Sequence, residues 1–188
     1  SLKSVDGFAY RDAYEMLCAT IGNEAMKFQY LMDSTKLTDR EKEQYGLLIK
    51  GGDRIPFEMD EVTLTGSLKT LSLLLEKHHG KQTVLLIDEY DVPLSKASEH
   101  GYYKEMVHFI RGLLGEALKT NDSLSFAVLT GCLRVSKESI FTGLNNFKIL
   151  SITDTRFDEQ FGFTDTEVRE MLKYYEIEDH YEEVKNWY

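Results

Sequence analysis

Three carboxylates directly follow a short apolar run. Asp88, Glu89 and Asp91 end the segment VLLIDEYD, and the four residues before them are all strand-forming. Such a run predicts a strand buried on both faces, as in a parallel sheet. In open α/β folds, ligands bind beyond the carboxyl ends of the strands. One carboxylate there can hold Mg²⁺ while the next orients or deprotonates an attacking water. We assign Asp88 to the metal and Glu89 to the water.

The same acids have simpler interpretations. Asp88 and Glu89 could end the strand and shape the turn that follows, as Asp commonly does. Asp91 stands two residues before Pro93, which favours a role in that turn over metal binding. An acidic strand end also serves in two-metal nuclease sites. A nuclease would need an acid-x-lysine pair at the end of a neighbouring strand, and residues 130–134 do not supply one.

A second apolar segment supplies further polar candidates. Residues 124–130, LSFAVLT, predict a strand that ends in Thr130, and Arg134 follows shortly after. In nucleotide-hydrolysing sheets, a polar side chain at such a strand end senses the γ-phosphate, and a nearby arginine stabilises transition-state charge. Thr130 fits the first role, and Arg134 or Lys137 fits the second. The alternative is that Thr130 caps the next turn while Arg134 pairs with surface carboxylates.

No phosphate-binding loop accompanies these residues. Such a loop needs glycines whose N–H groups converge on the anion, a lysine, and a strand that leads into a helix. The one Gly-Lys pair, Gly80-Lys81, has Leu75 in the place of the first glycine and Gln82 in the place of the Mg²⁺-binding hydroxyl. It also leads into a strand. The residues that would cradle the phosphates of ATP are therefore unknown from this sequence.

Alternating helices and apolar strands must position these side chains. Apolar spacing and capping residues predict helices over residues 8–33, 38–50, 64–79, 102–119, 164–175 and 179–188, and strands over 84–88, 124–130 and 148–153. Thr38 and Thr164 have the sequence context of helix N-caps. The order predicts a three-layer, mainly parallel α/β fold. We expect a peripheral helical segment at 1–60, a sheet core at 61–160 and a C-terminal helical segment at 161–188.

Charge and composition exclude some partners. A formal net charge of −10 over 188 residues argues against direct nucleic-acid binding. No segment approaches the about 20 apolar residues that span a bilayer, so we expect no membrane insertion. Two widely separated cysteines, Cys18 and Cys132, favour reduced thiols and a cytoplasmic protein. No Cys/His cluster has zinc spacing.

Three ordered motifs carry a family resemblance. LLIDEYDVPL (85–94), LTGCLRVSKESIFTGLNN (129–146) and FGFTDTEV (161–168) resemble the bacterial AAA-ATPase-like family, and SLKTLSLLLEKHHGK (67–81) is similar to the helix that precedes its acidic strand. Members combine a P-loop ATPase domain with, usually, a nuclease-like domain of the PD-(D/E)xK type. The resemblance covers residues 60–188. It implies that Asp88 and Glu89 form the Walker B pair and that Thr130 and Arg134 lie at the sensor end of the next strand.

The resemblance also implies what this chain lacks. The Walker A loop of the family would precede Ser1 and the nuclease-like domain would follow Tyr188, so we expect an incomplete P-loop sheet without its first strand. The parent protein would hydrolyse ATP with Mg²⁺, while the fragment alone would be inactive. An incomplete sheet exposes unpaired edges, which predicts rearrangement or self-association. The rival hypothesis is a non-catalytic interaction or regulatory domain with a degenerate nucleotide site.

Overall fold

A computed structural model describes residues 1–53, 55–132, 148–151, 156, 160 and 162–187. The chain divides into two compact units, residues 1–145 and 146–188. The predicted Arg134 and Lys137 lie outside the described residues.

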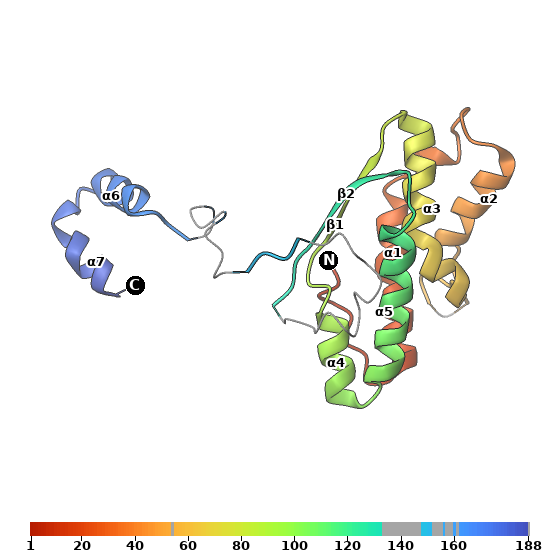
Figure 1. The fold of residues 1–188 in the computed structure, drawn as a ribbon, viewed down its shortest axis with the longest axis horizontal. Coiled ribbons are helices and arrows are strands. Elements are labelled where there is room, and N and C mark those ends of the chain that lie inside the picture. Colours follow the sequence, from red (N-terminus) through yellow and green to blue (C-terminus); the bar gives the residue numbers. More distant parts are fainter. Residues whose placement is uncertain (54, 133–147, 152–155, 157–159, 161, 188) are drawn as a thin grey trace. The chain divides into compact units, whose positions relative to one another are not determined.

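The first unit pairs two parallel strands with a set of helices (Figure 1). Its strands are β1 (Thr83–Ile87) and β2 (Leu124–Leu129), in register from Val84 opposite Phe126 to Ile87 opposite Leu129. Its helices are α1 (Tyr10–Met26), α2 (Asp39–Leu48), α3 (Glu61–His79), α4 (Val92–His100) and α5 (Tyr103–Leu118), with a short 3-10 turn at Gln29–Leu31. The predicted α/β class and the parallel pairing of the two strands are confirmed.

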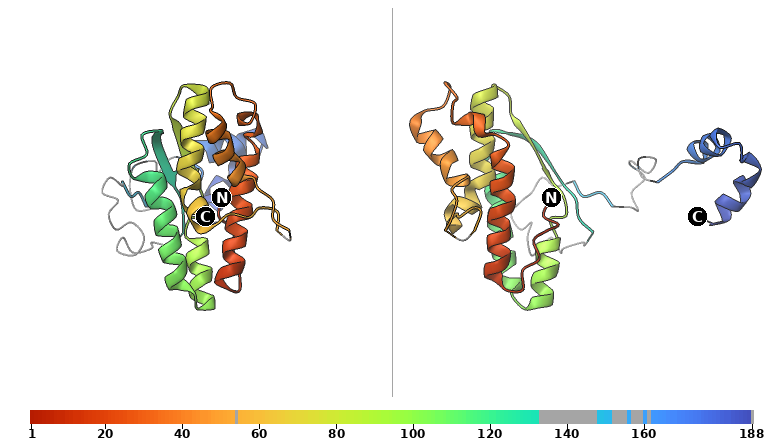
Figure 2. Two further views of the ribbon diagram at one scale, coloured as in Figure 1. Left: turned by 90° about the vertical axis from the view of Figure 1, so that its right-hand side faces the viewer. Right: turned by 180° about the vertical axis from the view of Figure 1, so that it is seen from behind.

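The long helices cover one face of the strands. Figures 1 and 2 show α1, α3 and α5 on the same side of β1 and β2, with α2 farther out. Helix α3 lies centrally and packs against α1, α2, α5 and β1. The core includes a continuous apolar stripe of α5: Met106, Phe109, Ile110, Leu113, Leu114 and Ala117.

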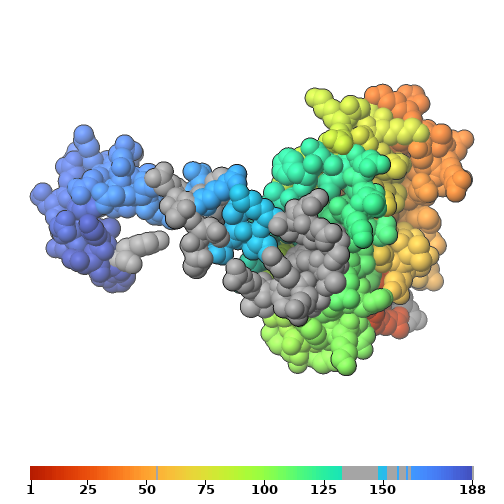
Figure 3. Space-filling view, viewed as in Figure 1, coloured from red at the N-terminus to blue at the C-terminus, as the bar shows by residue number. Residues whose placement is uncertain are grey.

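The other face of the strands is exposed. Leu86 of β1 is 70% exposed and Phe126 of β2 is 55% exposed; Val84 and Val128, their neighbours on this face, are also exposed. We call these four residues the outer sheet face. In the space-filling view, residues of β2 form part of the surface (Figure 3). The prediction of a strand buried on both faces is therefore wrong here, because the described helices cover only one face.

Local capping signals predicted helix ends correctly. Thr38 Oγ1 accepts a hydrogen bond from the Glu41 N–H at the start of α2, and the Glu41 carboxylate accepts one from the Thr38 N–H. Gly80 ends α3 with a φ of 70°, a conformation that favours glycine, and its N–H donates to Glu76 O. The Gly80-Lys81 pair thus terminates a helix.

Two predicted elements differ from the structure, and one observed helix was not predicted. The helix predicted over 8–33 ends at Met26, because the chain turns at Lys27 and Phe28 before burying Leu31. Helix α4 was not predicted, because Pro93 lies in the first turn of a helix here where we expected a turn. Residues 148–151 form no strand, and the rest of that predicted strand, 152–153, lies outside the described residues.

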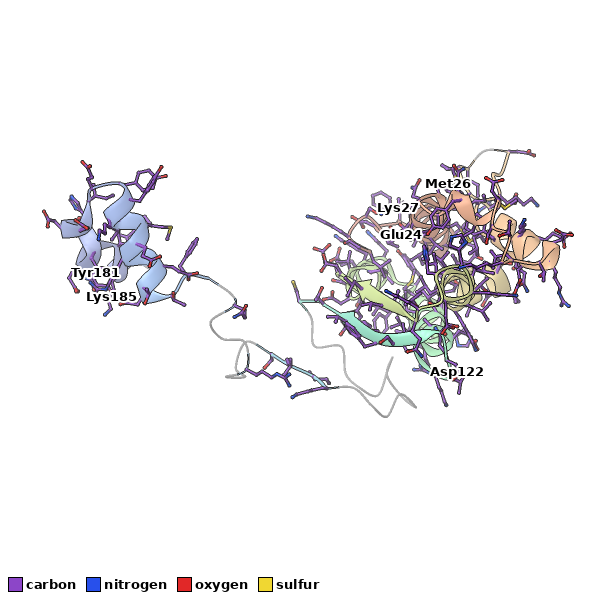
Figure 4. The ribbon with its side chains drawn as sticks, turned by 90° about the horizontal axis from the view of Figure 1, so that it is seen from above. Glu24, Met26, Lys27, Asp122, Tyr181 and Lys185 are labelled. Atoms are coloured by element: carbon purple, nitrogen blue, oxygen red, sulfur yellow. The ribbon has the colours of Figure 1, made fainter. Side chains whose placement is uncertain are left out.

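The second unit is a pair of short helices. Helix α6 (Asp165–Tyr174) begins at the predicted Thr164 capping box, and a turn at Glu178–His180 leads into α7 (Tyr181–Trp187). Tyr181 is buried between them: the Arg169 guanidinium lies 3.5 Å from its ring centroid and Lys185 Nζ lies 5.9 Å away (Figure 4). Across the described part of the chain, none of the helices is both long and apolar enough to span a membrane.

Candidate active site

Asp88 and Thr130 meet where the two parallel strands end. Ile87 and Leu129, the last paired residues, lie opposite each other, which puts the next residue of each strand at one edge of the sheet. The Thr130 N–H donates to Ile87 O at 2.9 Å, and Thr130 Oγ1 donates a hydrogen bond to Asp88 Oδ1. Both residues are exposed, so a ligand can reach them. The two strand ends predicted from sequence are brought together.

Glu89 follows in a strained backbone conformation. Its φ of 55° lies in the left-handed region, which costs free energy for any residue with a side chain. This conformation turns the chain out of β1, and the next N–H, that of Tyr90, donates to Thr130 O at 3.1 Å. Glu89 as a residue is partly buried, and its carboxylate accepts a hydrogen bond from Ser1 Oγ at 3.0 Å. Glu89 directly follows Asp88 in the chain and lies at the same edge of the sheet.

Two further side chains, the buried Asp91 and the partly buried Tyr90, lie beside this edge. Asp91, the N-cap residue of α4, is 3% exposed. Its carbonyl oxygen accepts the N–H groups of Leu94 and Ser95, while its carboxyl group packs against Gly131. Burial raises the pKa of the neighbouring Tyr90 phenol above its ordinary value, and the negative charge of Asp91 raises it further. Tyr90 therefore stays neutral at physiological pH.

The oxygen atoms at this edge suit magnesium. Asp88 presents a carboxylate, a hard oxygen ligand, and the Thr130 hydroxyl donates to it. Within the described ranges, no group of three or more His, Cys, Asp or Glu side chains gathers as a metal site. A Mg²⁺ ion bound through Asp88 would therefore take its other ligands from water and from a phosphate, which is how proteins commonly hold Mg²⁺. The residues present fit that ion.

Sequence reasoning gave two residues of this edge no part in the candidate site. We interpreted Asp91 as part of a turn, and we gave Gly131 no role. The pattern of a glycine directly after a polar strand end was available as a signal, because glycine inside or beside a strand often marks close approach of another group. Which group approaches Gly131 could not be read from the sequence, since Asp91 lies 40 positions earlier in the chain.

The fold and this edge define an α/β protein whose acidic and hydroxyl side chains meet at the carboxyl ends of neighbouring parallel strands. The chain belongs to the AAA-ATPase-like family: the family model, described as predicted AAA-ATPase, matches residues 6–141. The predicted family resemblance is thereby confirmed over residues 60–141, and the match also includes residues 6–59, while the motif at 161–168 lies outside the matched residues.

One curated relative adds a weaker likeness. A protein of Azotobacter chroococcum mcd 1, named "Uncharacterized protein in vnfD 5'region", is 34% identical over 90 residues, which is 47% of this chain. The matched segment spans only 17% of the length of that relative. No solved structure shows a significant match to the chain.

Proposed function

We propose that the protein containing this chain binds ATP with Mg²⁺ and hydrolyses it. Family membership supports this proposal. The observation that carries it is the hydrogen bond from the Thr130 hydroxyl to the Asp88 carboxylate, at the edge where parallel strands end. Open α/β sheets bind their ligands at such an edge. A cytoplasmic location is part of this proposal, because the two widely separated cysteines, Cys18 and Cys132, favour reduced thiols.

Each residue has a defined task in this proposal. Asp88 would hold Mg²⁺, and the ion would neutralise charge on the transferring phosphoryl group. Glu89 orients the attacking water and accepts its proton. Thr130 fixes the Asp88 carboxylate by donating to Oδ1, and its exposed position puts it at the edge where the γ-phosphate would bind. Arg134 is assigned to transition-state charge by the sequence alone, since it lies outside the described residues.

The assignment of Glu89 is tested by ATP turnover of the full-length protein. Glu89→Gln keeps the shape of the side chain but removes the base, so we expect turnover to fall about 100-fold or more while ATP binding persists. Glu99→Gln, at an exposed acid of α4, is the matched control and should turn over like the wild type. If Glu89→Gln hydrolyses ATP at the wild-type rate, the role given to Glu89 is wrong.

The isolated 188-residue chain gives a second test. Because its sequence contains no phosphate-binding loop, we expect no turnover and weak or no ATP binding by this segment alone. Titration calorimetry that found micromolar ATP affinity would contradict this expectation. ATP binding without turnover in the wild-type full-length protein would instead identify the non-catalytic, regulatory alternative.

A further inference from the structure

Asp91 occupies a helix N-cap without using its side chain as a cap. An N-cap aspartate normally accepts hydrogen bonds from N–H groups in the first turn of its helix. Asp60 does so at the start of α3, where its Oδ1 accepts the Thr63 N–H at 2.7 Å. The Asp91 side chain makes no such bond in α4, although it is almost fully buried. Burial of a carboxylate costs free energy, so its placement calls for a reason other than helix initiation.

The Asp91 carboxyl group instead packs against the backbone where β2 ends. A Cβ built on Gly131 would lie 2.6 Å from Asp91 Oδ1 and 2.9 Å from its Cγ. The same Cβ would lie 2.9 Å from Cε1 of the Tyr90 ring. Real Cβ atoms do not approach other atoms this closely, so only glycine fits at position 131 while Asp91 keeps its place. The chain leaving β2 therefore packs against two side chains of the segment that leaves β1.

Thr130 lies immediately before this contact. Its N–H donates to Ile87 O at 2.9 Å, and its carbonyl oxygen accepts the Tyr90 N–H at 3.1 Å. These two bonds hold its backbone beside β1, while the contact at Gly131 sets the direction in which the chain continues. The two backbone hydrogen bonds and the contact at Gly131 thus orient the Thr130 side chain, whose hydroxyl donates to Asp88 Oδ1.

We propose that Asp91 is a positioning residue of the candidate site: by packing against Gly131, it sets the Thr130 hydroxyl against the Asp88 carboxylate. Asp91 acts through shape and contact rather than by touching Mg²⁺ or nucleotide. This inference rests on the proposed function for its catalytic consequence. Its structural part, the dependence of Thr130 on Asp91, can be measured without any nucleotide.

The structural part is tested by methyl and amide NMR of Thr130 in the 188-residue chain. Asp91→Ala removes the contact and should move both Thr130 signals. Asp91→Asn keeps the side-chain shape and should leave them near their wild-type positions. Asp60→Ala is the matched control: it removes an N-cap aspartate whose side chain does cap its helix, so it should weaken α3 without moving Thr130.

A double-mutant cycle tests the contact itself. Gly131→Ala alone should displace Thr130 and destabilise the chain, because the new Cβ meets the Asp91 carboxyl group. In the Asp91→Ala background the same substitution should cost less, because the space is vacated. Gly131→Ala also serves as the second variant should Asp91→Ala not fold. If the stability effects of Asp91→Ala and Gly131→Ala were additive, the contact between Asp91 and Gly131 would not be what positions Thr130.

The catalytic part is tested in the full-length protein. Asp91→Ala should lower kcat about ten- to a hundredfold, as small misplacements of catalytic groups do, with the KM for ATP changed little. Asp91→Asn should restore most of the loss. The proposal fails if Asp91→Ala leaves the Thr130 signals and kcat at wild-type values, whatever its effect on stability. Should the wild-type protein hydrolyse no ATP, the proposed function fails separately, and the Thr130 signals alone decide the role of Asp91.

Discussion

At the scale of single residues, the backbone conformation of Glu89 supports its assignment to the candidate site independently of its carboxylate. A φ of 55° places a residue with a side chain in the left-handed region, at a cost of about 1 kcal/mol or more. Such strain persists only where the surroundings impose it, and it concentrates at functional sites. Glu176 has nearly the same φ, 59°, but it follows the end of α6, where many helices adopt this conformation.

Glycine substitutions at Glu89 and Glu176 distinguish the effect of backbone strain on stability from the effect of the side chain on turnover. Glu89→Gly relieves the left-handed strain, while the greater freedom of glycine in the unfolded chain offsets part of the gain. We expect the free energy of unfolding to stay constant or rise by up to about 1 kcal/mol. Turnover of the full-length protein should be lost at the same time. Glu176→Gly should show the same stability change and keep turnover.

Chemical denaturation and ATP turnover, measured on both variants, check this prediction. A clear loss of stability in Glu89→Gly would show that the Glu89 side chain is a structural element, held by contacts such as the one from Ser1. Full turnover in that variant would remove Glu89 from the mechanism.

The residue scale also shows how far the sequence could predict the site. Asp88 and Thr130 could be placed together from the sequence, because two apolar runs that form neighbouring parallel strands end at one edge. Asp91 could not be placed, because an aspartate before proline ordinarily serves the turn in which it stands. Its contact with Gly131 depends on how the exits of β1 and β2 pack, which no local pattern encodes.

At the scale of elements, one ion pair links the start of α2 to the end of α3. Lys77 Nζ lies 2.7 Å and 2.8 Å from the two carboxylate oxygens of Glu41, which also accepts from Thr38 within the capping box. The hydrogen bond from Lys77, followed by those from Thr38, lowers the pKa of Glu41 from 4.5 to about 2. The sequence predicted the cap because it is local, but not the lysine, 36 residues away.

Removing this lysine should change stability in a pH-dependent way. A lowered pKa means that the ionised carboxylate stabilises the folded state; this contribution is complete above pH 4.5 and is lost as the pH falls towards about 2. Lys77→Met should raise the pKa of Glu41 and cost about 0.5–1 kcal/mol at neutral pH. The difference from wild type should shrink below pH 4.5.

Carboxyl-carbon NMR titration and denaturation across this pH range provide the measurements. Glu167 is an internal control, because its pKa is lowered by hydrogen bonds from Thr164 in the matching capping box of α6. Its titration should be the same in Lys77→Met and wild type. A Glu41 titration unchanged by Lys77→Met would assign the lowered pKa to the capping box alone.

At the scale of the whole molecule, the outer sheet face departs most from what the sequence predicted. The apolar run of β1 resembles a strand covered on both faces, yet Val84 and Leu86 point away from the described helices and are exposed. An apolar run indicates that both faces of a strand are suited to burial. It does not indicate which elements of the protein cover those faces. An apolar sheet surface exposed in this way is prone to association. We therefore propose self-association of the 188-residue chain through this face.

Charge on the outer sheet face should prevent that association. Leu86→Lys puts a cation on its most exposed member, 70% exposed, whose burial against a second copy would then cost free energy. Val62→Lys is the matched control, because Val62 is 83% exposed on α3 and the substitution changes the net charge equally. In sedimentation velocity at increasing concentration, we expect the wild type and Val62→Lys to gain mass together while Leu86→Lys stays monomeric. A wild type that remains monomeric throughout, or a Leu86→Lys variant that associates equally, would mean that this face does not drive contact between copies.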